Sequence, residues 1–73
     1  MKGLISQLQE QEGFSESERT IANFLLANFR MLPGMSTRQL AKETFTSSAA
    51  IVRFSQKLGF GGYTEFRVKF WRI

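Results

Sequence analysis

The chain of 73 residues contains no cysteine, no histidine and no aspartate, and all six of its acidic residues are glutamate. Without cysteine there is neither a disulfide framework nor a cysteine-based metal site, which fits a cytoplasmic protein. Catalytic triads, zinc sites and EF-hand loops all draw on the absent residue types. The sequence therefore predicts a protein that is not an enzyme and that holds no cofactor and no metal ion.

Long apolar runs are also missing. No stretch approaches the roughly 20 apolar residues that span a bilayer, and the first residues lack the apolar segment and cleavage site of a signal peptide. The apolar fraction of 42% and the charged fraction of 22% are those of an ordinary globular domain. The length allows one domain, and a domain of this size buries only about 60% of the surface that its unfolded chain exposes.

Positive charge is concentrated in the C-terminal half of the chain. Residues 1–35 hold three basic and four acidic residues, a net charge of −1. Residues 36–73 hold seven basic and two acidic residues, a net charge of +5. This asymmetry favours a polyanion or an anionic surface as the partner of the second half.

Helix-start and helix-stop signals recur, whereas alternating apolar patterns of the strand type are absent. Residues 15–18 (SESE) and 36–39 (STRQ) each have the form of a capping box, residues 46–48 offer further N-caps, and Gly13 and Gly59 are helix stops. We expect helices over residues 2–12, 15–28, 37–44, 48–58 and 63–73, with the single proline in a loop. The predicted fold is all-α, a small five-helix bundle that contains a homeodomain-like helix-turn-helix motif.

The inner faces of these helices supply the predicted core. Met35, just before the second capping box, and Leu40 are placed to form a hydrophobic staple. We interpret most phenylalanines as core residues and not as stacking platforms for bases. The phenylalanines expected in the core are Phe24, Phe29, Phe54, Phe60, Phe66 and Phe70.

Residues 37–58 have helix-turn-helix spacing, with a helix of about eight residues, a short turn and a second helix. Ala41 is small where the two helices must approach closely. Ile51, Phe54 and Leu58 share the face of the second helix that points to the core, together with a serine. The opposite face is mildly polar and cationic, which suits entry into a major groove. The sequence therefore predicts that the second helix recognises double-stranded DNA.

The side chains on that face determine the predicted chemistry. Arg53 is able to make a bidentate contact with guanine O6 and N7, and Gln56 with adenine N6 and N7. Ala49 or Ala50 is placed to touch a thymine methyl group. The predicted DNA-contact residues are Arg38, Ser47, Ser48, Ala49, Ala50, Arg53, Gln56, Lys57 and Tyr63.

The remaining members of this set are predicted to contact the DNA backbone. Ser47 and Ser48, at the start of the helix, are suited to bind phosphate through hydroxyl and amide groups. Arg38 and Lys57 are suited to phosphate contacts that position the protein without specifying a sequence. Tyr63 offers a phenol to phosphate at the start of the last helix, although packing at the edge of the core is as good an interpretation.

Four segments of the chain resemble the N-terminal domain of the RpiR family of bacterial transcriptional regulators. They are residues 14–22 (FSESERTIA), 35–41 (MSTRQLA), 47–60 (SSAAIVRFSQKLGF) and 62–66 (GYTEF). The most specific part is IVRF followed by KLGF and the GYxEF tail, and the resemblance covers nearly the whole chain.

This resemblance implies a homodimeric regulator, usually a repressor and sometimes an activator, of sugar-catabolism genes. It also implies a C-terminal domain of the sugar-isomerase type that binds a phosphosugar effector. The 73 residues do not contain such a domain, so we expect a fragment of a longer regulator, with effector binding outside it.

Three positions depart from the common pattern. Phe45 stands where helix-turn-helix turns often have glycine, so the turn either avoids the left-handed conformation or is strained. Thr46 replaces a more usual apolar residue. Ala50 stands where the family often has a hydroxyl residue, which removes one potential DNA contact.

Two other functions explain part of the pattern. A helical protein–protein interaction module with a basic docking face would explain the charge but not the caps that flank a short turn. A basic amphipathic helix over residues 63–73 that lies on a membrane is the other alternative. Burial of that helix against a missing part of the protein is the simpler account, and we expect no membrane partner.

Overall fold

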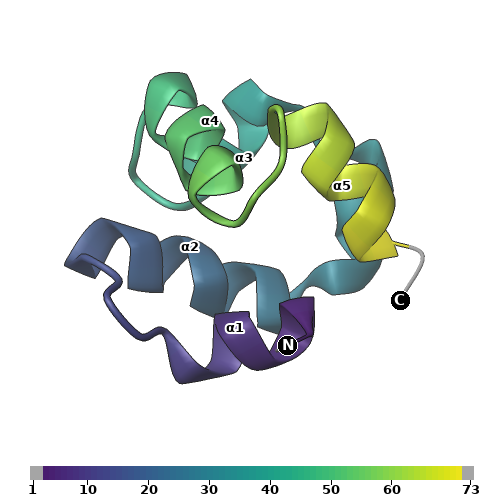
Figure 1. The fold of residues 1–73 in the computed structure, drawn as a ribbon. Coiled ribbons are helices and arrows are strands. Elements are labelled where there is room, and N and C mark those ends of the chain that lie inside the picture. Colours follow the sequence, from purple (N-terminus) through teal and green to yellow (C-terminus); the bar gives the residue numbers. More distant parts are fainter. Residues whose placement is uncertain (1–2, 72–73) are drawn as a thin grey trace.

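The computed structural model describes residues 3–71, which form five α-helices, one short 3-10 helix and no strand (Figure 1). The elements are α1 (Leu4–Glu10), α2 (Glu16–Ala27), η1 (Phe29–Gly34), α3 (Thr37–Glu43), α4 (Ser48–Lys57) and α5 (Tyr63–Trp71). The predicted all-α fold with five helices is confirmed. Lys2, Arg72 and Ile73, which were included in the predicted helices, lie outside the described residues.

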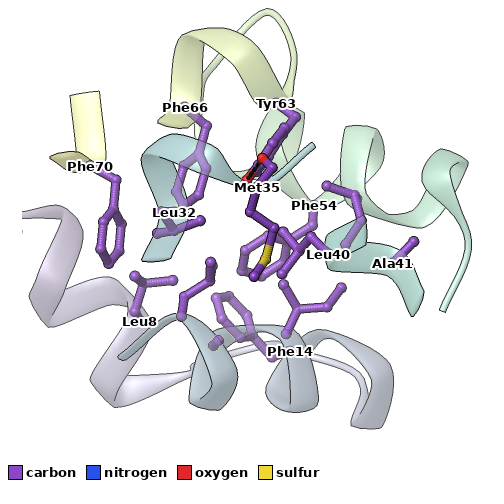
Figure 2. Close-up of a cluster of buried hydrophobic side chains, with 14 residues drawn as sticks. Leu8, Phe14, Leu32, Met35, Leu40, Ala41, Phe54, Tyr63, Phe66 and Phe70 are labelled. Atoms are coloured by element: carbon purple, nitrogen blue, oxygen red, sulfur yellow. Dashed lines mark hydrogen bonds between the residues drawn. The ribbon is translucent and has the colours of Figure 1, made fainter. Parts of the chain in front are cut away.

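The helices pack in pairs around one core. Helix α1 packs against α2, α3 packs against α4, and α5 contacts both α4 and η1. In Figure 1 the α1–α2 pair lies below the α3–α4 pair, and α5 closes one side of the space between them. The buried apolar residues are Leu8, Phe14, Ile21, Ala22, Leu25, Leu32, Met35, Leu40, Ala41, Ile51, Phe54, Tyr63, Phe66 and Phe70 (Figure 2).

Side-chain caps start three of the helices. Ser15 and Glu18 form the complete predicted capping box, since the Glu18 amide donates to Ser15 Oγ and the Ser15 amide donates to Glu18 Oε1. Ser36 accepts from the Gln39 amide at the start of α3. Within residues 3–71, however, no return bond from the Gln39 side chain completes the second predicted box. Ser47 accepts from the Ala50 amide and caps α4.

The first helix is shorter than predicted. It ends at Glu10 and not near residue 12, because Gln11 already adopts the left-handed conformation with φ 54°. The Gln11 amide donates to Gln7 O, and its side-chain Nε2 donates to Asn23 Oδ1 on α2 at 2.6 Å. Gly13 is also left-handed, at φ 75°. The two reversals bring the chain back toward the core, where Phe14 is buried.

The predicted loop around the single proline is instead the 3-10 helix η1. Leu32 in this segment is buried, which holds the segment against the core beside α5. Phe29 is 51% exposed, so its predicted core position is wrong. The reason is that α2 ends at Ala27, so Phe29 no longer follows the helical phase of the apolar face of α2. Of the other five phenylalanines expected in the core, three are buried, and Phe24 and Phe60 pack against it partly buried.

Phe66 is the centre of an aromatic cluster that joins α4 and α5. Its ring centroid lies 6.3 Å from that of Phe54, 5.5 Å from Phe60 and 5.5 Å from Phe70. Phe54 in turn lies edge-on to Phe14, with centroids 5.5 Å apart. The pairs of Phe66 with Phe54 and Phe60 are edge-to-face, and such pairs at these distances contribute beyond the burial of apolar area. The cluster therefore fixes α4 relative to both α5 and the segment that precedes α2.

Candidate nucleic-acid interface

Helices α3 and α4 and the turn between them form a helix-turn-helix. Ala41, the small residue predicted at the contact of the two helices, is 5% exposed, and α3 packs against α4. The Ala41 carbonyl accepts the Thr46 amide at 2.9 Å, so one backbone bond closes the turn. Leu40 of α3 and Ile51 of α4 are both buried beneath the motif. The geometry of the turn is thus set by close packing and by the backbone.

The hydroxyls of two threonines form hydrogen bonds inside the turn. Thr44 is buried, and its Oγ1 donates to Leu40 O at 2.8 Å. The same Oγ1 lies 2.9 Å from Thr46 Oγ1. Because a hydroxyl has one hydrogen and that of Thr44 is used on Leu40, Thr46 is the donor in this pair. This pairing explains how a half-buried threonine is tolerated where an apolar residue is more usual.

Phe45 adopts the left-handed conformation, with φ 58°, so the turn does not avoid it. For a bulky residue this conformation is unfavourable by about 1–2 kcal/mol. Its side chain is 93% exposed and contributes nothing to the core. Of the two conformations expected from the sequence, the turn therefore adopts the strained one.

Helix α4 has one buried and one exposed face. Ile51 and Phe54 are buried and Leu58 packs partly buried against the core, as predicted. Ser55 is also buried, and its hydroxyl donates to Ile51 O at 3.0 Å. The exposed or half-buried residues of the other side include Ser48, Ala49, Ala50, Arg53 and Gln56. The predicted direction of each face is confirmed, and Gly59 ends the helix at φ 99°, as expected.

An open groove of about 660 Å³ separates the exposed side of α3 from the start of α4. Arg38 and Lys42 lie one turn apart on α3 and line this groove together with Ser47, the N-cap of α4, and Ser48. The groove is lined by Ser36, Arg38, Gln39, Ala41, Lys42, Thr46, Ser47 and Ser48. None of these described lining residues carries a carboxylate, so the groove is cationic and rich in hydroxyl groups. Such a surface suits a phosphate chain.

Lys42 and Gln39 were not among the predicted DNA-contact residues. The signal was present, since Lys42 follows Arg38 by four residues and such residues share a helix face. Which face of α3 borders α4, however, depends on how the two helices pack.

Lys57 is held within the domain. Its Nζ donates to Gly13 O at 2.8 Å and to Glu18 Oε1 at 3.0 Å, and it lies 5.4 Å from the centroid of the Phe14 ring. These contacts tie the end of α4 to the start of α2. The charge of Lys57 is paired with Glu18, a residue 39 positions away in the sequence, while its side chain remains 40% exposed. The predicted phosphate contact of Lys57 stays a prediction.

Tyr63 also lies in the core, with 3% exposure. Its hydroxyl donates to Met35 O at 3.0 Å, and Arg67 Nη1 donates to the same oxygen at 3.0 Å. Burial raises the pKa of the Tyr63 phenol, against a smaller lowering by Arg67. The phenol therefore joins α5 to the segment before α3 and does not face outward, in contrast to the predicted phosphate contact.

The pKa of Glu18 is lowered below its ordinary value of 4.5. The Ser15 amide that donates to the carboxylate is the largest cause, burial opposes it, and the Lys57 ammonium adds to the lowering. A carboxylate with a lowered pKa stabilises the fold above its unfolded-state pKa, and this contribution is lost as the pH falls through the lower folded-state value.

Glu18→Gln is expected to reduce the free energy of unfolding at neutral pH by about 0.5 kcal/mol, because the amide keeps an acceptor for Ser15 but loses the partly exposed ion pair. The difference from the parent protein should shrink as the pH falls from 4.5 through the lower folded-state pKa of Glu18, where the parent also loses the charge. Urea unfolding followed by circular dichroism at a series of pH values measures this difference. A difference that stays constant down to pH 3 would contradict the account.

The fold and the geometry of this surface define the class of the protein: it is a helix-turn-helix domain of the DNA-binding transcription regulators. No helix in the described part of the chain is long and apolar enough to cross a membrane. Among the same residues, no cluster of three metal-ligating side chains occurs.

Comparison with known proteins gives the family. The model of the "Helix-turn-helix domain, rpiR family" matches residues 1–72. The chain is also similar to the structure of the Vibrio vulnificus NanR protein complexed with ManNAc-6P, at 32% identity and a TM-score of 0.86. The match covers 93% of this chain and 26% of that one, so the chain spans about a quarter of NanR. It belongs to the RpiR family of helix-turn-helix domains, which is not a family of enzymes.

Proposed function

We propose that α4 is a recognition helix that enters the major groove of double-stranded DNA while a backbone phosphate segment lies in the groove between α3 and α4. The observation that carries this proposal is the continuity of two surfaces. The exposed side of α4 carries hydrogen-bonding groups for base edges, and the adjoining groove carries two cations and several hydroxyls without a carboxylate.

We assign a role to each residue of the proposed DNA surface. Arg53 binds guanine and Gln56 binds adenine, each in a bidentate manner, and Ala49 or Ala50 packs on a thymine methyl group. Phosphates are bound by Arg38, Lys42, Ser47 and Ser48. We leave Lys57 and Tyr63 out of this set because both are engaged within the domain.

We further propose that the domain acts within a longer homodimeric regulator of sugar or sugar-phosphate metabolism. In a dimer, two copies of α4 would reach half-sites about 34–36 Å apart along the DNA. A phosphosugar effector would bind outside these 73 residues. The support is the similarity to NanR, whose structure contains ManNAc-6P.

The direct test is selection of bound sequences from a library of random duplexes, followed by fluorescence anisotropy with the enriched duplex and with a random one. We expect enrichment of a defined sequence and a log–log salt dependence with a slope of about −0.9 for each phosphate neutralised. An acidic-protein docking module or a membrane-binding helix would enrich no sequence. Absence of binding to any duplex at low salt would overturn the proposal.

Lys42→Ala and Lys69→Ala form a matched pair for the groove. Both lysines are exposed, but only Lys42 lines the groove between α3 and α4. Lys42→Ala is expected to weaken binding of the enriched and random duplexes by similar factors and to reduce the salt slope by about 1. Lys69→Ala should change the slope less, and equal effects of both substitutions would mean that charge alone attracts DNA.

A further inference from the structure

Phe45 combines two unfavourable features that the fold does not require. Its backbone occupies the left-handed region at φ 58°, where glycine would be unstrained, and its ring is 93% exposed to water. A glycine at this position would remove the backbone strain, and a polar residue would remove the exposure of an apolar ring. Strain of this kind is often found at binding sites, where the side chain that it presents has a function.

The turn holds Phe45 in a defined place. The Thr46 amide donates to Ala41 O at 2.9 Å, and the Phe45 amide donates to Lys42 O at 3.3 Å. The hydroxyls of Thr44 and Thr46, on either side of Phe45, lie 2.9 Å apart. Hydrogen bonds of the residues on both sides of Phe45 therefore hold the turn that presents the ring.

Phe45 stands in the sequence between residues of the proposed DNA surface, although it does not itself line the groove. Lys42, three residues before Phe45, and Thr46, Ser47 and Ser48, which follow it, all line the groove between α3 and α4. Along a DNA strand, the deoxyribose units are the less polar parts between the charged phosphates. An aromatic ring presented from the turn between proposed phosphate-binding residues is matched to such a sugar.

We propose that Phe45 is a further DNA-contact residue, whose ring packs on a deoxyribose of the strand that lies along the α3–α4 groove. This inference rests on the proposed function of the domain. Glu43 is an exposed carboxylate at the same end of α3, so the contact is with the uncharged sugar and not with a phosphate. The alternative is that the ring contacts a protein partner, in which case substitutions of Phe45 would leave DNA affinity unchanged.

The test uses Phe45→Gly, Phe45→Ala and Phe45→Tyr, each measured for thermal unfolding and for affinity toward the enriched duplex. Phe45→Gly should melt at the same temperature as the parent protein or higher, because the backbone strain is released. Its affinity for DNA should nevertheless fall about tenfold, as expected for partial loss of the burial of one ring. Phe45→Ala should lose as much affinity, and Phe45→Tyr should keep that of the parent.

Phe29→Ala is the matched control, because Phe29 is 51% exposed but lies on η1. It should leave the affinity unchanged. If the parent protein binds the enriched duplex and Phe45→Gly binds it equally well, the sugar contact is wrong and the proposed function stands. Equal losses of DNA affinity in Phe29→Ala and Phe45→Ala would also overturn the sugar contact. If the parent protein binds no duplex, the proposed function itself fails.

Discussion

Phe54→Ala is expected to reduce the free energy of unfolding by about 3–5 kcal/mol, the largest effect of any single substitution considered for this domain. Phe54 is 1% exposed and lies between Phe14 and Phe66, with which it forms edge-to-face pairs. Truncation to alanine leaves a cavity lined by rings from separate elements, which relax only in part. Domains of this length have a total stability on the order of 4–11 kcal/mol, so the variant should be largely unfolded on mild heating.

Urea unfolding followed by circular dichroism measures the effect. Phe29→Ala provides the comparison, because Phe29 is half exposed and its loss should change stability by less than about 0.5 kcal/mol. A loss below about 1 kcal/mol in Phe54→Ala would show that the core closes around the missing ring and that the aromatic cluster does not fix α4.

Arg53→Ala is expected to reduce discrimination between the enriched and the random duplex by about 1–3 kcal/mol, because the bidentate contact with guanine is lost. Stability should stay nearly unchanged, since the side chain is exposed. The measured quantity is the ratio of the two affinities at one salt concentration.

Arg53→Lys separates charge from geometry at the same position. Lysine keeps the positive charge but lacks the planar fork that matches guanine, so binding of random DNA should persist while discrimination falls. If both variants keep the affinity ratio of the parent protein, Arg53 does not contact a base, and α4 would have to read DNA through other residues.

Much of the fold was predictable because its signals are local. The caps of Ser15, Ser36 and Ser47 depend on residues three positions away, and the left-handed stop at Gly59 depends on one residue. The inner and outer faces of α4 followed from helical periodicity for the same reason. Local hydrogen bonds and periodicity are properties of a short segment, so they appear in the sequence.

Other features depend on contacts between residues that are distant in the sequence. Lys57 looks like a free cation in its own segment, and only the tertiary fold brings its ammonium to Glu18. Tyr63 looked equally suited to the surface and the core, and its bond to Met35, 28 residues earlier, places it inside. The 3-10 helix η1, which stands in place of the predicted proline loop, packs against α5 and contains the buried Leu32. These contacts are not local in the sequence.

The bonds of Lys57 to Gly13 and Glu18 have a consequence for association. They join the end of α4 to the N-terminal part of the domain, and Phe54 secures its middle through the ring of Phe14. Helix α4 is thus preorganised, so it loses little conformational entropy when a ligand binds to its exposed face. Affinity gained in this way comes from rigidity and adds to whatever the contacting side chains supply.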